Sequence, residues 1–296
     1  MNDMKKAYVF PGQGAQFTGM GKEDWTNHPE AREWYQIADE VMGFPLSQVM
    51  FEGSEDELKE TRVTQPAIFV QSVVRARLAG SAFQPEAVAG HSLGEFSALT
   101  AAGALTFEEG LRLVKERALA MQAACELTES TMAAIVGLDD EVVEKICAGI
   151  SDVVVPANYN SPGQLVISGS LSGIEQAVTL LQEAGAKRAL VLAVGGAFHS
   201  PLMEPARERL ATAIMEASFS RPSCPVYQNV HASPETDPDR IRENLIAQLT
   251  APVKWTQTIQ RMYGDGFTEF IEVGGKGVIL RGLIRRIEPS ATTSAL

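Results

Sequence analysis

The sequence predicts an α/β protein in which a smaller βαββαβ unit interrupts a larger α/β domain. Over much of the 296 residues, short apolar runs alternate with helix-forming stretches, as in sheets covered by helices. From about residue 131 to residue 194 the order changes to strand, helix, two strands, helix and strand. That order is the signature of a ferredoxin-like unit. A chain of this length can bury either one large core or two smaller ones.

The first part of the chain predicts two strands and several helices. A strand at 7–10 enters a glycine-rich turn, and a second short strand covers 87–89. Helices are predicted at 30–42, 54–60, 65–80, 95–105 and 107–124. The last of these begins after Thr106, an N-cap residue that is followed by two glutamates in the first helical turn.

The middle of the chain forms the predicted inserted unit, residues 128–198, and the larger domain comprises 1–127 and 199–296. Strands are predicted at 132–136, 153–159, 164–168 and 189–194, and helices at 139–148 and 171–184. The cluster Asn160-Ser161-Pro162-Gly163 is typical of a turn between two strands. Gly185 predicts the end of the second helix.

The last part of the chain returns to the larger domain. Helices are predicted at 201–217, 238–250 and 255–264, and strands at 226–227 and 268–272. A further helix near the C-terminus carries Arg281, Arg285 and Arg286. The residues from Pro289 onward are expected to form a tail.

Composition excludes several classes of function. The net charge of −12 argues against nucleic-acid binding. The 3 cysteines are widely spaced, which suggests neither a disulfide framework nor a zinc site, and the 4 histidines form no metal-binding pattern. No apolar run approaches the roughly 20 residues of a membrane span, and no signal peptide is evident, so we expect a cytoplasmic protein.

The segment Gly90-His91-Ser92-Leu93-Gly94 matches the G-x-S-x-G motif that exposes a nucleophilic serine. It lies between a predicted strand and a predicted helix, which is the context the motif requires. The sharp turn would leave no room for side chains at the two glycines, and the backbone N–H of Leu93 would point into the site. The side chain of His91 should point away from the serine, so we expect a structural role for it.

The turn Gly12-Gln13-Gly14 after the first strand could approach a ligand closely because its glycines carry no side chain. It does not match G-x-G-x-x-G, and no acidic residue follows at the distance that ribose binding requires, so a dinucleotide site is rejected. An ordinary loop between a strand and a helix explains the turn equally well.

Seven motifs in order resemble the malonyl-CoA:acyl-carrier-protein transacylase family over nearly the whole chain. They are Phe10 to Gln16, Thr64 to Ala67, Gly90 to Glu95, Arg117, Asn160 to Gln164, Gly196 to Ser200, and Gln248-Leu249 with 252–255 and 272–274. The resemblance implies an α/β-hydrolase-like core with a ferredoxin-like insert. It also implies a malonyl-CoA substrate, an acyl carrier protein partner and no permanently bound cofactor. We expect a monomer.

The resemblance assigns the catalytic roles. Ser92 would carry the acyl group, and His199 would be its base, since a serine hydroxyl needs one. The backbone carbonyl of Gln248 would orient His199, with no carboxylate in that role. The oxyanion hole would combine the backbone N–H groups of Leu93 and Gln13.

Further residues are assigned to the substrate. Arg117 would pair with the malonyl carboxylate, because a guanidinium matches its two oxygens. Periodicity alone favours a surface arginine that lies over a core face. Phe198 would limit the space beside the acyl α-carbon, or else be a core aromatic, and Gln65 and Asn160 would lie near the pocket.

Carrier binding is expected at basic clusters, which could instead be solvated faces. They are Lys187-Arg188, and Arg281 with Arg285 and Arg286. The same residues would also suit a free-standing acyltransferase of a polyketide assembly line. A serine thioesterase and an inactive carrier-binding module are further alternatives. The first lacks an evident triad acid, and the second is disfavoured by the presence of Ser92, His199 and Arg117.

Overall fold

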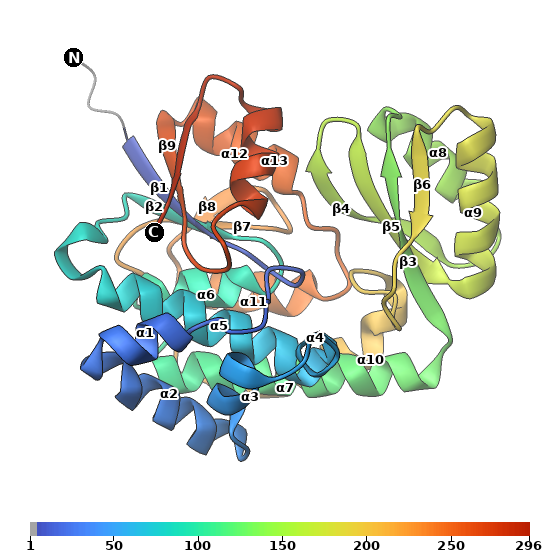
Figure 1. Cartoon of the computed structure of the whole chain (residues 1–296). Helices are drawn as coiled ribbons and strands as arrows, with labels where there is room; N and C mark the ends of the chain where they lie inside the picture. The colour runs from blue at the N-terminus through green and yellow to red at the C-terminus, as the bar shows by residue number, and fades with distance from the viewer. Residues whose placement is uncertain (1–4) are drawn as a thin grey trace.

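Two β-sheets organise the chain, and helices cover both (Figure 1). The structure is a computed structural model that describes residues 5–296. The prediction of a mixed α/β protein is confirmed. Within the described residues, no helix combines the length and the apolar character that crossing a bilayer requires.

The larger sheet has six strands in the order β10-β9-β1-β2-β7-β8. The strands are β1 (Lys5–Phe10), β2 (Ala87–Gly90), β7 (Val226–Gln228), β8 (Ser233–Glu235), β9 (Phe267–Glu272) and β10 (Thr292–Ala295). All neighbours are parallel except β7 and β8, which are antiparallel. The central strands β1 and β2 are buried over 7–10 and 87–90, where both carry apolar residues because helices cover both of their faces.

Two groups of helices cover the two faces of this sheet. The larger group is α1 (Lys22–Asn27), α2 (Pro29–Met42), α3 (Leu46–Glu52), α4 (Glu55–Lys59), α5 (Thr61–Leu78), α6 (Gly94–Ala101), α7 (Phe107–Leu127), α10 (Glu204–Glu216) and α11 (Pro238–Gln248). The opposite face is covered by α12 (Trp255–Gly264) and α13 (Ile279–Ile287), whose apolar residues form a separate core with β1 and β9. Helix α5 lies centrally and is buried along most of its length.

The smaller sheet has four antiparallel strands in the order β4-β5-β3-β6. The chain runs β3 (Ser130–Val136), α8 (Asp140–Ala148), β4 (Val154–Ser161), β5 (Gln164–Ser170), α9 (Leu171–Glu183) and β6 (Arg188–Val191). Both helices pack on one face of the sheet and enclose a core of their own. Figure 1 shows this unit beside the larger sheet.

Strand β4 joins the smaller sheet to the larger body. The N–H of Tyr159 donates to the carbonyl of Val253 at 2.9 Å, and the N–H of Val253 donates to Ala157 at 2.8 Å. Arg286 of α13 also donates to the side chain of Gln164 at 2.6 Å. The small unit is therefore hydrogen-bonded to the segment that directly follows α11.

Several features differ from the sequence-based prediction. Strand β8 was not predicted, and helix α6 ends at Ala101 rather than at 105. The expected tail after Pro289 contains strand β10, which pairs with β9 although its sequence TTSA is polar, because it lies at the sheet edge. The short helices α1 and α3 have no evident signal in the sequence. Helix α5 begins at Thr61 rather than 65, so Pro66 lies inside it.

Candidate active site

The turn between β2 and α6 holds Ser92 in a left-handed backbone conformation, with φ 53°. A side chain at Gly90 would overlap the backbone of Gly94, and one at Gly94 would overlap the carbonyl of Phe10. Both glycines of the motif are therefore required by close backbone packing. A non-glycine residue in this conformation costs roughly 1–2 kcal/mol, which the surrounding contacts must offset.

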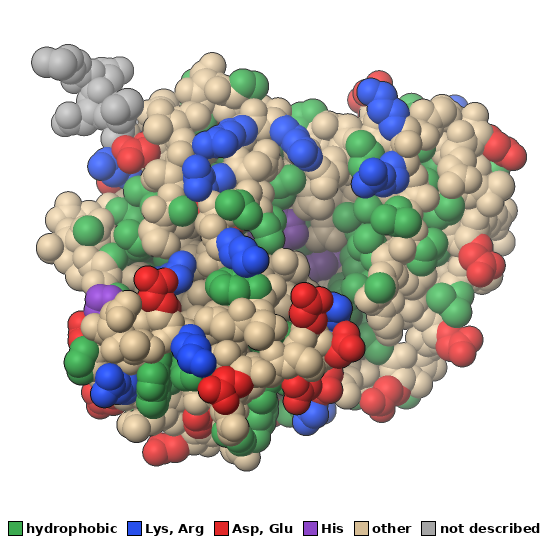
Figure 2. All heavy atoms as spheres, in the orientation of Figure 1, with side chains coloured by type: hydrophobic (Ala, Val, Ile, Leu, Met, Phe, Trp, Pro, Cys, Tyr) green, Lys and Arg blue, Asp and Glu red, His purple; other side chains and the backbone are tan. Residues whose placement is uncertain are grey.

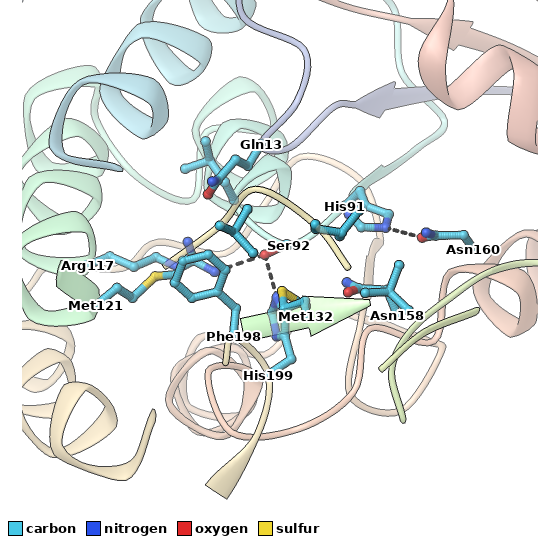
Figure 3. A pocket seen from close by; sticks show the side chains of 14 residues that line it. Gln13, His91, Ser92, Arg117, Met121, Met132, Asn158, Asn160, Phe198 and His199 are labelled. Carbon is cyan, nitrogen blue, oxygen red and sulfur yellow. Dashed lines mark hydrogen bonds between the residues drawn. The ribbon is translucent and has the colours of Figure 1, made fainter. Parts of the chain in front are cut away.

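Ser92 and His199 form a hydrogen-bonded pair, with 2.7 Å between Oγ and Nε2. The other ring nitrogen, Nδ1, lies 2.9 Å from the carbonyl of Gln248 and 3.2 Å from that of Ala251. Carbonyls only accept hydrogen bonds, so Nδ1 carries the proton and Nε2 is free to accept one from Ser92. Figure 3 shows the two side chains meeting at the cavity.

The environment of His199 keeps its imidazole neutral. The ring is 4% exposed, and burial lowers the pKa of His199 to about 3, with the charge of Arg117 adding to the effect. No carboxylate hydrogen-bonds either ring nitrogen in the part of the chain that the structure describes. The pair therefore has a main-chain partner in the place of a third acidic side chain.

Arg117 of α7 is 1% exposed, so the interpretation of it as a surface arginine is wrong. Its Nη1 donates to Gln65 at 2.7 Å, and its Nη2 donates to Ser92 Oγ at 3.0 Å and to the side-chain oxygen of Gln248 at 3.3 Å. Burial lowers the pKa of Arg117 to about 10, while the nearby carboxylate of Glu95 opposes the shift. The guanidinium remains charged at neutral pH and faces the nucleophile (Figure 3).

Gln65 lies behind the guanidinium of Arg117 and is fully buried. Its amide nitrogen meets the sulfur of Met121 at 3.2 Å. It is absent from the residues that line the cavity, so it contacts Arg117 and not the cavity itself. The family resemblance placed Gln65 near the pocket but did not show that it acts through Arg117.

The glycine-rich turn after β1 lies against the elbow. A side chain at Gly12 would overlap the carbonyl of His91, and the next residue, Gln13, lines the cavity with Leu93. Among residues 5–296 the backbone N–H groups of Gln13 and Leu93 donate to no protein acceptor. Two unpartnered amides thus border the cavity that contains the Ser92 hydroxyl.

The cavity has a volume of about 190 Å³ and an uneven lining. Phe198, Met121 and Met132 supply apolar surface, and Asn158 and Asn160 supply amides. His91 is turned toward Asn160, with 2.8 Å between its Nε2 and Oδ1 (Figure 3). Its ring also packs against Trp255, with centroids 5.5 Å apart. His91 therefore binds the small unit and does not contact the serine hydroxyl.

Two residues with a place in the site were not assigned a role from the sequence. Glu95 is fully buried directly after the elbow, and burial raises its pKa to about 7. Asn229, which follows β7, is also fully buried and binds the elbow. The available signal for Glu95 was that it is the one charged residue of helix α6, and Asn229 gave no comparable signal.

The basic residues assigned to the carrier lie on two separate elements. Lys187 and Arg188 are exposed at the start of β6, and Arg285 and Arg286 are exposed on α13. Arg281 is half-buried, and it donates to the carbonyl of Gly277 at 2.9 Å. Figure 2 shows Lys and Arg side chains on both sides of a cleft in which histidine side chains are visible.

Comparison with known proteins gives a consistent family. Residues 7–295 match the acyl transferase domain model. Malonyl CoA-acyl carrier protein transacylase from Bacillus subtilis is 41% identical over 99% of this chain and 93% of its own length.

Two solved structures are similar over almost their whole length. The acyl carrier protein S-malonyltransferase of Vibrio cholerae has a TM-score of 0.94 at 41% identity, covering 99% of this chain and 96% of that one. A malonyl-transacylase solved with its type II PKS acyl-carrier protein has a TM-score of 0.95 at 38% identity, with the same coverage. The chain belongs to the acyl transferase family and, within it, to the malonyl-CoA:acyl carrier protein transacylases.

Proposed function

We propose that this protein transfers a malonyl group from malonyl-CoA to the phosphopantetheine thiol of an acyl carrier protein. The observation that carries the proposal is the contact between the buried guanidinium of Arg117 and the hydroxyl of Ser92, at 3.0 Å. A permanently charged group beside a nucleophile selects an acyl group that bears a negative charge. The family relatives are malonyl transacylases, which agrees with that selection.

The first half-reaction makes an ester of Ser92. Its Oγ attacks the thioester carbonyl while Nε2 of His199 takes the hydroxyl proton. The amides of Gln13 and Leu93 bind the oxygen that becomes negative. The carbonyl then re-forms, the carbon–sulfur bond breaks, and His199 returns the proton to the departing thiolate of CoA.

The second half-reaction reverses these roles. The thiol of the carrier loses its proton to His199 as its sulfur attacks the Ser92 ester, and the serine oxygen recovers that proton on release. No step needs more than these residues and the two thiols, so the proposal includes no permanently bound cofactor. Asn160 and Phe198 line the cavity in positions to contact the acyl group or the pantetheine arm.

Arg117 also disfavours acyl groups that have no charge. A neutral acyl chain would leave the buried guanidinium facing apolar surface without a partner for its charge, and such groups are costly to leave unpaired. Gln65 and Gln248 fix the guanidinium from the side away from the cavity, at 2.7 and 3.3 Å. The selection is thus built into the site before the substrate binds.

Carrier docking is proposed at basic residues at the start of β6 and on α13. They are the exposed Lys187, Arg188, Arg285 and Arg286 and the half-buried Arg281. A carrier of this kind is acidic and this chain has a net charge of −12, so docking requires local positive charge. Fatty-acid synthesis is the role we favour. The polyketide alternative is kept, because one relative was solved with a type II PKS carrier.

The finer fold assignment is also a proposal. The parallel larger sheet with a serine elbow after β2 supports an α/β-hydrolase-like core formed by residues 1–127 and 199–296. The strand order β4-β5-β3-β6 and the βαββαβ sequence support a ferredoxin-like subdomain at 128–198. A monomeric state, a cytoplasmic location and the lack of nucleic-acid binding stay predictions.

The decisive experiment is the intact mass of the protein after incubation with malonyl-CoA. We expect a single malonyl adduct, its absence in Ser92→Ala, and its loss when a carrier thiol is added. Steady release of free malonate without a carrier would instead indicate a thioesterase. The absence of any adduct on the unmodified chain would indicate a binding module and contradict the proposal.

A further inference from the structure

The side chain of Asn229 binds the backbone of the elbow at two points, Ser92 and Gly90. Its Oδ1 accepts the N–H of Ser92 at 2.8 Å, and its Nδ2 donates to the carbonyl of Gly90 at 2.7 Å. The carboxamide of Asn229 therefore links Gly90 to Ser92 across the strained turn between β2 and α6. Because an amide has an acceptor at one end and a donor at the other, it matches these two backbone groups.

Asn229 is itself held on its backbone. It is fully buried, and its N–H donates to Glu95 Oε2 at 2.9 Å. Its carbonyl accepts the N–H of Lys254 at 3.2 Å. The second oxygen of Glu95 accepts a hydrogen bond from Gln228 at 2.8 Å. A buried carboxylate on the first turn of α6 thus fixes the residue that binds the elbow from which α6 starts.

The hydrogen bond from Ser92 to Asn229 also occupies the backbone N–H of Ser92, which is then not available to the substrate. The N–H of Ser92 is occupied by Asn229, whereas those of Leu93 and Gln13 have no acceptor among residues 5–296. Gln248 adds a second contact to the same turn, since its Nε2 donates to the carbonyl of Ser92 at 3.0 Å. The backbone of the nucleophile is consequently held at both its N–H and its C=O.

We propose that Asn229, fixed by Glu95, is a positioning residue that keeps Ser92 in its left-handed conformation with Oγ directed at His199. The inference deepens the proposed function because it concerns the same nucleophile. It predicts that loss of the Asn229 carboxamide lowers the rate at which Ser92 reacts and leaves substrate affinity nearly unchanged. Arg117, which recognises the acyl charge, makes no hydrogen bond to Asn229.

The first test separates rate from affinity. We expect Asn229→Ala to slow single-turnover acylation of Ser92 by malonyl-CoA at least about tenfold. Affinity is measured by calorimetry in the non-reacting Ser92→Ala background with and without Asn229→Ala, and should change by less than about twofold. A sulfonyl fluoride provides a second rate, because it labels an activated serine without needing the malonyl site. Its labelling should slow by a similar factor.

The second test uses a pH-dependent replacement. In Asn229→Asp one oxygen still accepts the N–H of Ser92, but the other faces the carbonyl of Gly90 and can donate to it only when protonated. The ratio of the labelling rate of Asn229→Asp to that of the unmodified protein should therefore rise as the pH falls from about 8 to 5. Burial of the charged Asp could also weaken the fold in a way that acid relieves, so the ratio is compared only at pH values where circular dichroism shows Asn229→Asp to be folded.

A matched control is Asn244→Ala. Asn244 donates to the side chain of Gln228 at 2.8 Å but hydrogen-bonds to neither Ser92 nor Gly90. Its loss should leave the rates of reaction with malonyl-CoA and with the sulfonyl fluoride unchanged. If Asn229→Ala fails to fold, the pH dependence of Asn229→Asp decides the question alone.

Normal rates in Asn229→Ala, a loss confined to affinity, or a ratio for Asn229→Asp that does not vary with pH would overturn the inference. If the unmodified protein reacts with the sulfonyl fluoride but not with malonyl-CoA, the proposed function fails. The positioning role is then judged from sulfonyl fluoride labelling.

Discussion

The guanidinium of Arg117 and the hydroxyl of Ser92 are in direct contact, with 3.0 Å between Nη2 and Oγ. They come from different elements: Ser92 lies in the turn before α6, and Arg117 lies in the middle of α7. The contact places a fixed positive charge beside the atom that forms the new bond. It connects the recognition of the acyl group with the chemistry, and the first prediction follows from it.

Arg117→Ala should lose malonyl transfer and favour acetyl transfer in relative terms. The malonyl carboxylate loses its charged partner, while an acetyl group no longer faces an unpaired cation. The measurement is the ratio of acylation rates with malonyl-CoA and acetyl-CoA. Arg112→Ala on the same helix is the control, because that arginine is exposed and pairs with Glu109 at 3.9 Å. An equal loss with both substrates would show that Arg117 has only a structural role.

His199→Ala should slow acylation of Ser92 by on the order of 10³ or more, because His199 acts first as base and then as acid. Rapid-quench measurement of the malonyl adduct gives the rate. His231→Ala is a suitable control, because His231 is exposed and lies outside the cavity. A decrease below about tenfold would mean that another group takes the proton.

The pH dependence of acylation should lack a decline near the usual pKa of histidine. The pKa of His199 is lowered to about 3 by burial and by Arg117, so the neutral base persists as the pH falls below about 6.5. Protonation of His199 should therefore cause no decline in acylation between about pH 5 and 8, wherever circular dichroism shows the fold intact. Replacing Arg117 by Gln removes a nearby positive charge, which raises the pKa of His199 and moves the acid decline to higher pH. Identical acid limbs in the two proteins would contradict this coupling.

Charge reversal at Lys187 and Arg188 should raise the KM for the carrier and leave acylation by malonyl-CoA nearly unchanged, because the two half-reactions are separable. The effect should shrink with added salt, since surface charges are screened over about 10 Å at 0.1 M. Arg285→Glu is tested separately from Arg286→Glu, because Arg286 also binds Gln164 of the small unit. Lys22→Glu with Arg32→Glu, on the remote helices α1 and α2, is the control (Figure 1). An unchanged carrier KM in every variant would place docking on another surface.

Local pattern was enough to predict the order of most strands and helices. Apolar strands, N-cap residues and turn clusters can each be recognised from a few neighbouring residues, so β1, β2 and the βαββαβ unit could be located. Strand β10 could not, because a polar edge strand owes its structure to β9 and not to its own residues. The mixed α/β architecture was therefore predictable, but the edge of the sheet was not.

The site was predictable where residues carry motifs. The elbow glycines are required by backbone contacts within a few residues, so the G-x-S-x-G pattern identifies Ser92 directly. Gln13, His199 and Gln248 came only from the resemblance, since nothing local links them to Ser92. Asn229 and Glu95 were missed because their roles arise from hydrogen bonds across 134 and 137 residues of sequence.

His199 reaches the site along the chain from β6 of the small sheet, but its ring is hydrogen-bonded to Gln248 and Ala251 at the end of α11. Its covalent connection and its orientation thus belong to different parts of the molecule. The hydrogen bonds that orient the ring of His199 therefore come from the larger body. The small sheet contributes walls to the cavity and binds the elbow through Asn160 and His91. An engineered exchange of this sheet would therefore have to keep that hydrogen bond, while the partners of the His199 ring would stay in place.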